Sequence, residues 1–173
     1  MADANSIDPR KLSPAEFSEL LAPATDNGID PQTFARLIKY ASAEQLGAVL
    51  GDPTLRRALL DRIFNRMSGQ FRPKHAPQRD SAIHWRITDG PDGDEVYETW
   101  ITGTREHATP QCSTSNEPSH DPRVTLTMPG EQFLKLVSGN GTPTMMVVMG
   151  KVQLDGDIGF AARLSTIFDL PKA

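Results

Sequence analysis

Residues 123–168 read RVTLTMPGEQFLKLVSGNGTPTMMVVMGKVQLDGDIGFAARLSTIF, and this stretch carries the clearest periodic patterns in the chain. Val124, Leu126 and Met128 alternate with threonines, which is typical of a strand with one buried face and one exposed face. Two short helices are expected next, the second beginning at Thr142-Pro143. The stretch therefore opens in the order strand, helix, helix.

A second strand and a closing helix complete this stretch. Val152, Leu154 and Ile158 alternate with polar residues, so this strand also has one apolar face. Apolar residues then recur at helical spacing, and we expect a single amphipathic helix that covers the apolar face of the sheet. Its buried positions are Phe160, Ala161, Leu164, Ile167 and Phe168.

This order of elements resembles the sterol carrier protein type two family, the non-specific lipid-transfer proteins. The resemblance rests on the Gln132-Phe133 helix, the methionine-rich helix and the motif Gly-Lys-Val-Gln-Leu-Asp-Gly-Asp at residues 150–157. It is close over residues 123–170 and looser from about residue 54. It implies an α+β fold in which a mixed five-stranded sheet is covered by helices that enclose an internal apolar cavity.

Four helices are expected at the front of the chain, because each start carries a capping signal. Ser13-Pro14-Ala15-Glu16 is a capping box with proline in the first turn, and Asp30-Pro31 and Asp52-Pro53 are similar starts. Ser42 with Gln45 marks the remaining start, and the helices should span roughly 14–22, 31–41, 43–50 and 53–68. We therefore divide the chain into a helical extension, residues 1–51, and a lipid-binding domain, residues 52–173.

The segment between the fourth helix and residue 123 should supply the rest of the sheet. The fourth helix has one apolar stripe, and its arginines, Arg56 among them, are expected on its other faces. A hairpin is expected from Ile83 to Thr102, with two Asp-Gly pairs at the turn. A third strand is predicted near residues 107–111, before a polar loop that ends at Pro122.

Composition excludes several classes of protein. The chain has 173 residues with 38% hydrophobic content, which suits one domain plus a small extension. A net charge of -4 argues against nucleic acid as a partner, because phosphates need a basic surface. No signal sequence is seen at residues 1–5, and the longest apolar run is 145–149, so we expect a cytoplasmic protein.

Neither catalysis nor metal binding has a convincing signature. His107, Cys112 and His120 are chemically suited to zinc, but their spacing matches no common metal motif and a fourth ligand is not identified. No Gly-x-Ser-x-Gly motif is present, and Gly139-Asn140-Gly141 is interpreted as a turn. We therefore expect no enzymatic activity, no cofactor and no metal.

The expected site is a set of apolar side chains, because a lipid carrier needs shielded apolar volume. The methionines around residue 146 are flexible and suit ligands of varied shape, although filling the core would explain them equally well. Trp85 shares an apolar face with Ile83, whereas Trp100 should be half-exposed. The residues assigned to ligand binding are Trp85, Trp100, Leu126, Phe133, Leu136, Met145, Met146, Met149, Phe160, Leu164 and Phe168.

Two functions are therefore compatible with the sequence. The first is non-catalytic binding, and intracellular transfer, of a sterol, a fatty acyl chain or a similar hydrophobic molecule in an apolar tunnel. Contact with a membrane would then be transient, since Arg163 is the one basic residue of segment 158–170. The alternative is an accessory module without a ligand that docks a partner protein through residues 1–51.

Overall fold

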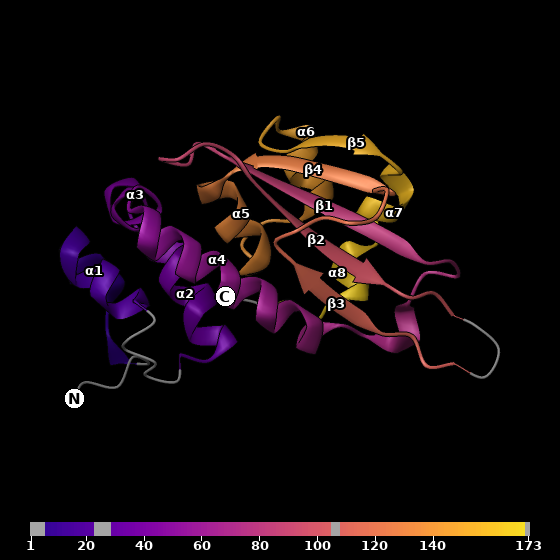
Figure 1. Ribbon diagram of the computed structural model, residues 1–173. Coiled ribbons are helices and arrows are strands. Elements are labelled where there is room, and N and C mark those ends of the chain that lie inside the picture. Colours follow the sequence, from indigo (N-terminus) through magenta and orange to yellow (C-terminus); the bar gives the residue numbers. More distant parts are fainter. Residues whose placement is uncertain (1–5, 23–28, 105–107, 172–173) are drawn as a thin grey trace.

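A mixed five-stranded sheet with the spatial order β3-β2-β1-β4-β5 forms the centre of the protein (Figure 1). The computed structural model describes residues 6–22, 29–104 and 108–171. Strand β1 pairs with β4 in parallel, and the other neighbouring strands are antiparallel. The strands are β1 Ser81–Thr88, β2 Glu95–Ile101, β3 Cys112–Ser115, β4 Val124–Pro129 and β5 Gln153–Gly156. The α+β class and the five-stranded mixed sheet are confirmed.

The hairpin formed by β1 and β2 follows the sequence expectation. Trp85 lies opposite Tyr97 and Ile83 opposite Thr99, so both strands turn the same face toward the helices. At the turn, Asp89 has a φ of 62° and Gly93 a φ of 105°. Aspartate and glycine tolerate this left-handed region better than other residues, which explains why the two Asp-Gly pairs mark the turn.

The third strand was predicted at the wrong place. It spans Cys112–Ser115 and not residues 107–111, and His107 lies outside the described residues. The strand pairs Thr114 with Thr99 of β2, and the Thr114 hydroxyl donates to the Phe64 carbonyl. A four-residue edge strand of small polar residues has no periodic apolar pattern, so these tertiary hydrogen bonds decide where it lies.

The closing segment also differs from the prediction. Strand β5 ends at Gly156, whose φ is 110°, and the side chain of Asp157 accepts a hydrogen bond from the Phe160 amide. Helix α7, Ile158–Ala162, begins there, so Ile158 does not belong to the strand and is 71% exposed. The Arg163 amide donates to the Phe160 carbonyl, which ends α7, and a second short helix, α8 Leu164–Ile167, follows.

The helices at the front of the chain begin where the capping signals predict. They are α1 Pro14–Leu21, α2 Pro31–Tyr40, α3 Ala43–Leu50 and α4 Pro53–Met67. Both capping boxes form, with Ser13 paired to Glu16 and Ser42 to Gln45. Short 3-10 turns cover Pro9–Lys11, Ser68–Gln70 and Pro73–His75, and the remaining helices are α5 Gly130–Val137 and α6 Pro143–Val148.

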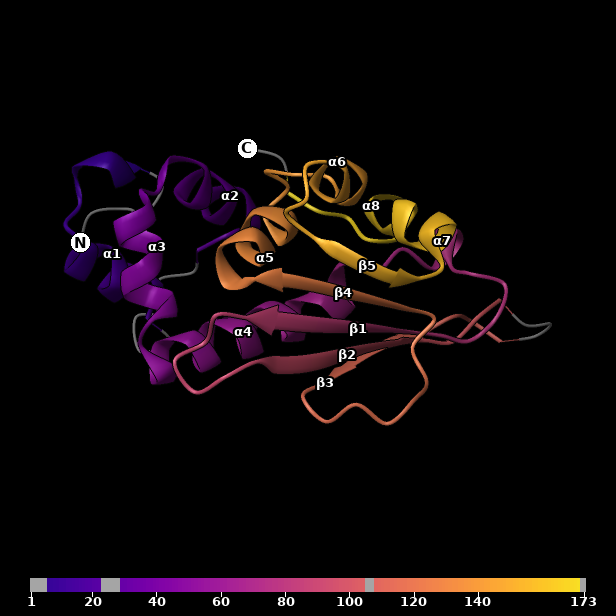
Figure 2. The ribbon, with the colours of Figure 1, turned by 90° about the horizontal axis from the view of Figure 1, so that it is seen from above.

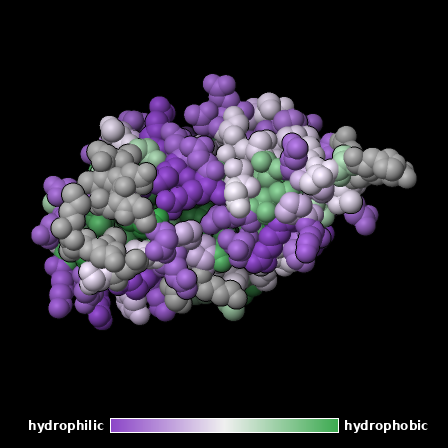
Figure 3. Space-filling model, turned by 90° about the horizontal axis from the view of Figure 1, so that it is seen from below, coloured by the Kyte–Doolittle hydropathy of each residue, from purple (hydrophilic) through white to green (hydrophobic). Residues whose placement is uncertain are grey.

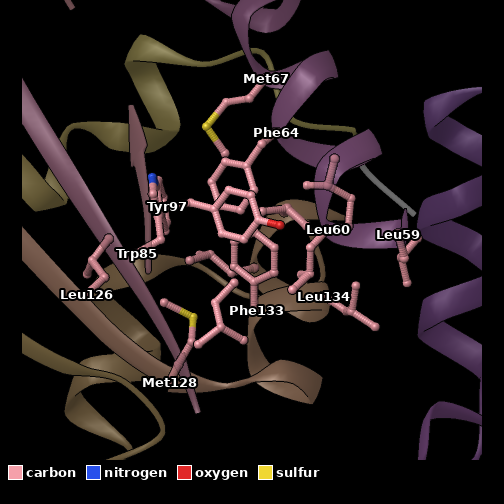
Figure 4. Close-up of a cluster of buried hydrophobic side chains, with 14 of the residues drawn as sticks. Leu59, Leu60, Phe64, Met67, Trp85, Tyr97, Leu126, Met128, Phe133 and Leu134 are labelled. Carbon is pink, nitrogen blue, oxygen red and sulfur yellow. The ribbon is translucent and has the colours of Figure 1, made fainter. Parts of the chain in front are cut away.

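One apolar core joins the front helices, the later helices and the sheet within the described part of the chain. Phe64 of α4 stacks on Tyr97 with 4.2 Å between ring centroids, and on Phe133 of α5 with 5.2 Å (Figure 4). Figure 2 shows α1, α2 and α3 at one end of the molecule, beside α4 and α5. Their apolar side chains, including Phe17 and Leu46, belong to the same core, so the extension is packed onto the rest. The boundary at residue 51 stays a prediction.

Arg56 is not on the outer face of α4, as predicted, but only 1% exposed. Its guanidinium donates to Glu95 from Nε and Nη2, and to the Thr88 carbonyl from Nη2. The Arg56 side chain fits here because residue 130 is a glycine. A Cβ atom at that position would lie 3.0 Å from Arg56 Nη1. The pairing satisfies a charge that burial would otherwise penalise strongly.

Candidate functional site

Two apolar hollows lie between the helices and the sheet, and they meet at Met67 and Val137. The first has a volume of about 30 Å³ and the second of about 20 Å³. The first is lined mainly by α2 and α4: Leu21, Ile29, Pro31, Phe34, Leu59, Arg62, Ile63, Arg66, Met67, Gln70, Val137 and Pro171. The second is lined by Met67, Trp85, Leu136, Val137, Pro143, Leu164, Phe168 and Leu170.

Met67 occupies the junction between the two hollows. It is the last residue of α4, is 3% exposed, and lies beside the aromatic cluster in Figure 4. Its sulfur accepts a 3.2 Å hydrogen bond from the Thr99 hydroxyl, whose oxygen accepts one of 2.9 Å from Trp85 Nε1. Because these contacts form one chain, displacement of Met67 would change the surroundings of the Trp85 indole.

Among the residues that the structure describes, the wall of the second hollow contains no ionisable side chain. Its walls offer burial of apolar surface, which suits a hydrocarbon and provides no acid, base or nucleophile. In the present conformation each hollow has room for only a water or two. A lipid-sized ligand therefore requires the walls to separate, and the unbranched Met67 side chain is well suited to move.

The structure brings some of the predicted ligand residues together. Trp85, Leu136, Leu164 and Phe168 line the second hollow. Leu126, Phe133 and Phe160 are buried in the surrounding core, and Met146 is buried against Gly141. The other three predicted residues are elsewhere: Trp100 lies on the opposite face of the sheet, and Met145 and Met149 are each 58% exposed.

Sequence reasoning did not select Met67 or Val137, although both line both hollows. Met67 belongs to the apolar stripe of α4, and the sequence pattern alone does not distinguish it from the other core residues of that stripe. Its residue type fits the role, since an unbranched methionine provides a flexible apolar wall, but this type alone does not separate it from the other methionines of the chain.

A polar cluster lies on the other face of the sheet, where Glu98 is buried between two histidines. His84 Nε2 lies 2.9 Å from Glu98 Oε2, and His120 Nδ1 lies 2.7 Å from Oε1. The backbone amides of Ser119 and His120 also donate to Glu98, and the His120 ring stacks on Trp100 at 3.7 Å. Glu98 thereby holds the loop that joins β3 to β4 against the sheet.

These hydrogen bonds determine the pKa of Glu98. Burial alone raises the pKa of this carboxyl, but the hydrogen bonds from His120, His84 and Ser119 outweigh it and lower the pKa to about 2. An unfolded glutamate has a pKa of about 4.3, so the folded state binds fewer protons between these values. Glu98 therefore adds stability above about pH 4.3, and this contribution is lost as the pH falls toward about 2.

We expect Glu98→Gln to flatten the acid side of the stability profile. The free energy of unfolding of the wild type should fall between about pH 4.5 and pH 2 more steeply than that of the variant. Urea unfolding followed by tryptophan fluorescence at several pH values measures both curves. Parallel curves would mean that Glu98 is not the group responsible.

Of the residues considered for metal binding, the structure describes His120 and Cys112. Among residues 6–22, 29–104 and 108–171, no three His, Cys, Asp or Glu side chains are grouped so as to hold a metal ion. His120 is paired with Glu98, and burial raises the pKa of the Cys112 thiol to about 12, which disfavours the thiolate that metals bind. None of the helices in the described part of the chain is both long enough and apolar enough to cross a bilayer.

A model of the SCP-2 sterol transfer family matches residues 70–169 of this chain. Hydroxysteroid dehydrogenase-like protein 2 of Xenopus tropicalis is 38% identical over 53 residues, which are 31% of this chain and 13% of that protein. The match therefore covers only a small part of that relative's length.

Three solved structures of low sequence identity show limited similarity to this chain. The palmitated SCP2L2 of Aedes aegypti is 22% identical, with a TM-score of 0.48 over 66% of this chain and 94% of that one. Sterol Carrier Protein 2 of Yarrowia lipolytica is 16% identical, with a TM-score of 0.43 over 68% and 93%. The sec-alkylsulfatase Pisa1 of Pseudomonas sp. is 14% identical, with a TM-score of 0.47 over 92% of this chain and 27% of that one.

Proposed function

Because this chain belongs to the SCP-2 sterol transfer family, we propose that it binds a hydrophobic small molecule without catalysis, between the sheet and the helices around Met67. The observation that carries the proposal is the pair of apolar hollows that meet at this one flexible side chain. The ligand would separate the walls and occupy both hollows.

Burial of a hydrocarbon chain supplies enough free energy for such binding. Each buried methylene contributes about 0.8 kcal/mol, so ten methylenes contribute roughly 8 kcal/mol before costs. Ordering the ligand and moving the walls reduce this gain by several kcal/mol. Micromolar dissociation constants correspond to about 8 kcal/mol, so a chain of 14 to 18 carbons would reach that range.

Transfer between membranes needs a surface that tolerates lipid. Helices α6 and α7 flank an apolar groove of about 160 Å³, and Val148 beside it is 78% exposed. Pro143 lines both this groove and the second hollow, so the exposed surface and the interior are adjacent. This arrangement supports transient membrane contact and would shorten the path of a departing ligand.

The alternative, a partner protein docked on residues 1–51, has weaker support. The large apolar side chains of α1, α2 and α3 are mostly buried within the chain, and Tyr40 is the large hydrophobic residue that remains exposed among their described residues. Residues 1–5 and 23–28 lie outside the described part. A partner would therefore have to recognise mainly polar surface on these helices.

Co-purification and displacement together test the proposal. Native mass spectrometry of the intact protein should show a fraction carrying one lipid-sized adduct, because apolar ligands dissociate slowly into water. Displacement of a fluorescent fatty acid by unlabelled ligands should then give a single site of micromolar affinity. A protein that carries no adduct and displaces no probe would support the partner-docking alternative.

The emission of Trp85 provides a local readout of the same event. In a Trp100→Phe variant, Trp85 is the remaining tryptophan, and its indole is linked through Thr99 to Met67. Ligand entry past Met67 should shift the Trp85 emission, with saturation at the same concentration as probe displacement. Unchanged emission at full occupancy would place the ligand elsewhere.

A further inference from the structure

We infer that a second site, a polar cleft between α4 and the β3 edge of the sheet, binds a small primary amine through its ammonium group. The cleft has a volume of about 360 Å³, whereas the two hollows around Met67 have about 30 Å³ and 20 Å³. Among the described residues, none lines both the cleft and a hollow. The inference is therefore independent of the proposed function and gives the protein a further ligand.

The walls of the cleft are held together by contacts between the helix and the sheet. Helix α4 lies beside β3 (Figure 1), and the Thr114 hydroxyl joins the two by donating to the Phe64 carbonyl at 3.0 Å. Tyr97 of β2 also lines the cleft, and its ring stacks on Phe64 with 4.2 Å between ring centroids. Because these contacts fix the walls, the cleft is formed before a ligand arrives.

The polar groups that remain free in the cleft are mainly hydrogen-bond acceptors. The Tyr97 hydroxyl donates its proton to Asp61 Oδ1 at 2.6 Å, and the Thr114 proton is already used, so both hydroxyl oxygens keep free lone pairs. Within the described part of the chain, Asp61 Oδ2 and the side-chain amides of Asn65 and Asn116 have no hydrogen-bond partner. An asparagine can turn its carbonyl oxygen toward a donor, so a matching ligand is one that is rich in donors.

Asp61 gives the cleft a negative charge. Burial and the hydrogen bond to Asp61 raise the pKa of Tyr97, so the phenol keeps its proton at neutral pH and continues to donate to the carboxylate. Asp61 is the ionisable carboxylate among the described lining residues, and the nearest undescribed residue, 107, is seven positions before Thr114. An ammonium group carries one positive charge, three donors and no acceptor, so it is complementary to a carboxylate surrounded by acceptors.

The same groups discriminate between small ligands of different charge. A ligand carboxylate would be repelled by Asp61, and a diol would leave that charge without a counterion. Arg57 is exposed, lies one turn before Asp61 on α4, and its charge acts on the Tyr97 hydroxyl. It therefore competes with a bound ammonium for the same carboxylate. We expect an amine to bind more tightly than a diol, and a diol more tightly than an acid.

The test titrates small molecules that differ in one functional group. The probes 4-amino-1-butanol, 1,4-butanediol and 4-hydroxybutanoate are added at neutral pH to the full chain labelled with nitrogen-15, and two-dimensional NMR measures both affinity and location. The amine should bind in the millimolar range and at least about tenfold more tightly than the diol, because a charge-assisted hydrogen bond replaces a neutral one. The largest amide shifts should occur at Asn65, Ser115 and Asn116, which line the cleft.

Variants assign the effect to the charge of Asp61. Asp61→Asn keeps an oxygen that accepts from Tyr97, and it should weaken amine binding about tenfold while changing diol binding less than about twofold. Arg57→Gln removes the competing cation and should strengthen amine binding about twofold to threefold. Asn65→Ala, at an exposed position, leaves the Tyr97 hydrogen bond intact and should weaken amine binding about threefold.

A control separates this site from general attraction of cations to an acidic protein. The net charge is -4, and Figure 3 shows hydrophilic residues over much of the surface seen from below. Asp155 is an exposed aspartate on β5, at the opposite edge of the sheet from β3, so Asp155→Asn makes the same change of charge away from the cleft. This control should bind the amine with the affinity of the wild type.

Three results would overturn the inference. They are equal weakening by Asp61→Asn and Asp155→Asn, equal affinity of the wild type for amine and diol, and absence of amine binding to the wild type. Thermal unfolding curves check that Asp61→Asn is folded. If it is not, Asn65→Ala decides, and unchanged amine affinity in that variant would contradict a site in the cleft.

Discussion

Met67→Trp should weaken binding of a fluorescent fatty acid at least about thirtyfold while the protein remains folded. The indole would fill the junction and parts of both hollows, so the ligand could no longer pass from one to the other. Overpacking at a buried site costs about 1–3 kcal/mol in stability, which a domain of this size can tolerate. Probe titration measures the affinity, and urea unfolding measures the stability.

Matched variants distinguish a blocked site from a damaged fold. Met145→Trp makes the same substitution on an exposed methionine and should alter neither property. Met67→Ala removes the side chain from the junction, so it should lower the free energy of unfolding by about 2–5 kcal/mol yet preserve or strengthen ligand binding. Weak binding by Met67→Trp, together with intact binding by the less stable Met67→Ala, would locate the ligand at Met67. Wild-type affinity in Met67→Trp would show that the ligand does not pass this residue.

Glu95→Ala should lower the free energy of unfolding by about 3–5 kcal/mol. Glu95 is 27% exposed, but the guanidinium that it neutralises is only 1% exposed and would be left buried without its carboxylate. The pair joins the start of α4 to the β1–β2 hairpin, so its loss also loosens the helix that carries Met67. Urea unfolding of wild type and variant gives the difference directly.

A second substitution should restore most of that loss. Arg56→Met combined with Glu95→Ala removes both charges and keeps an apolar side chain of similar length, so the double variant should be more stable than Glu95→Ala alone. Asp94→Ala breaks the nearby Arg86 pair, whose side chains are 55% and 37% exposed, and should cost less than about 1 kcal/mol. Equal losses for Glu95→Ala and Asp94→Ala would contradict the assignment of Arg56 as a buried anchor.

Local signals predicted the parts of the fold that local interactions determine. The capping boxes at Ser13 and Ser42 begin α1 and α3 where expected, and period-2 alternation located β1 and β4. The sequence-based predictions failed where contacts between residues far apart in the sequence determine the structure. Strand β3 depends on pairing with β2, and Arg56 is buried because Glu95, far away in the sequence, faces it. Neither contact leaves a periodic trace in the sequence.

The candidate site was predictable in kind but only partly in detail. Trp85, Leu136, Leu164 and Phe168 were identified because they lie on apolar faces of regular elements. Met145 and Met149 were assigned to ligand binding, but the structure exposes both, since α6 is a six-residue helix whose buried methionine is Met146. Met67 could be recognised only after α4 was placed on the sheet, because its role comes from lying between two hollows.

Methyl NMR of the six methionines is the most direct test of the central claim. With methionine methyl groups labelled with carbon-13 and assigned by single substitutions, a long-chain fatty acid is titrated into the intact protein. We predict that the Met67 methyl shows the largest shift and direct NOE contacts to the ligand chain, while the exposed Met145 and Met149 methyls change little. Contacts to Met145 and Met149 with an unperturbed Met67 would mean surface binding, and would contradict a ligand site between the sheet and the helices.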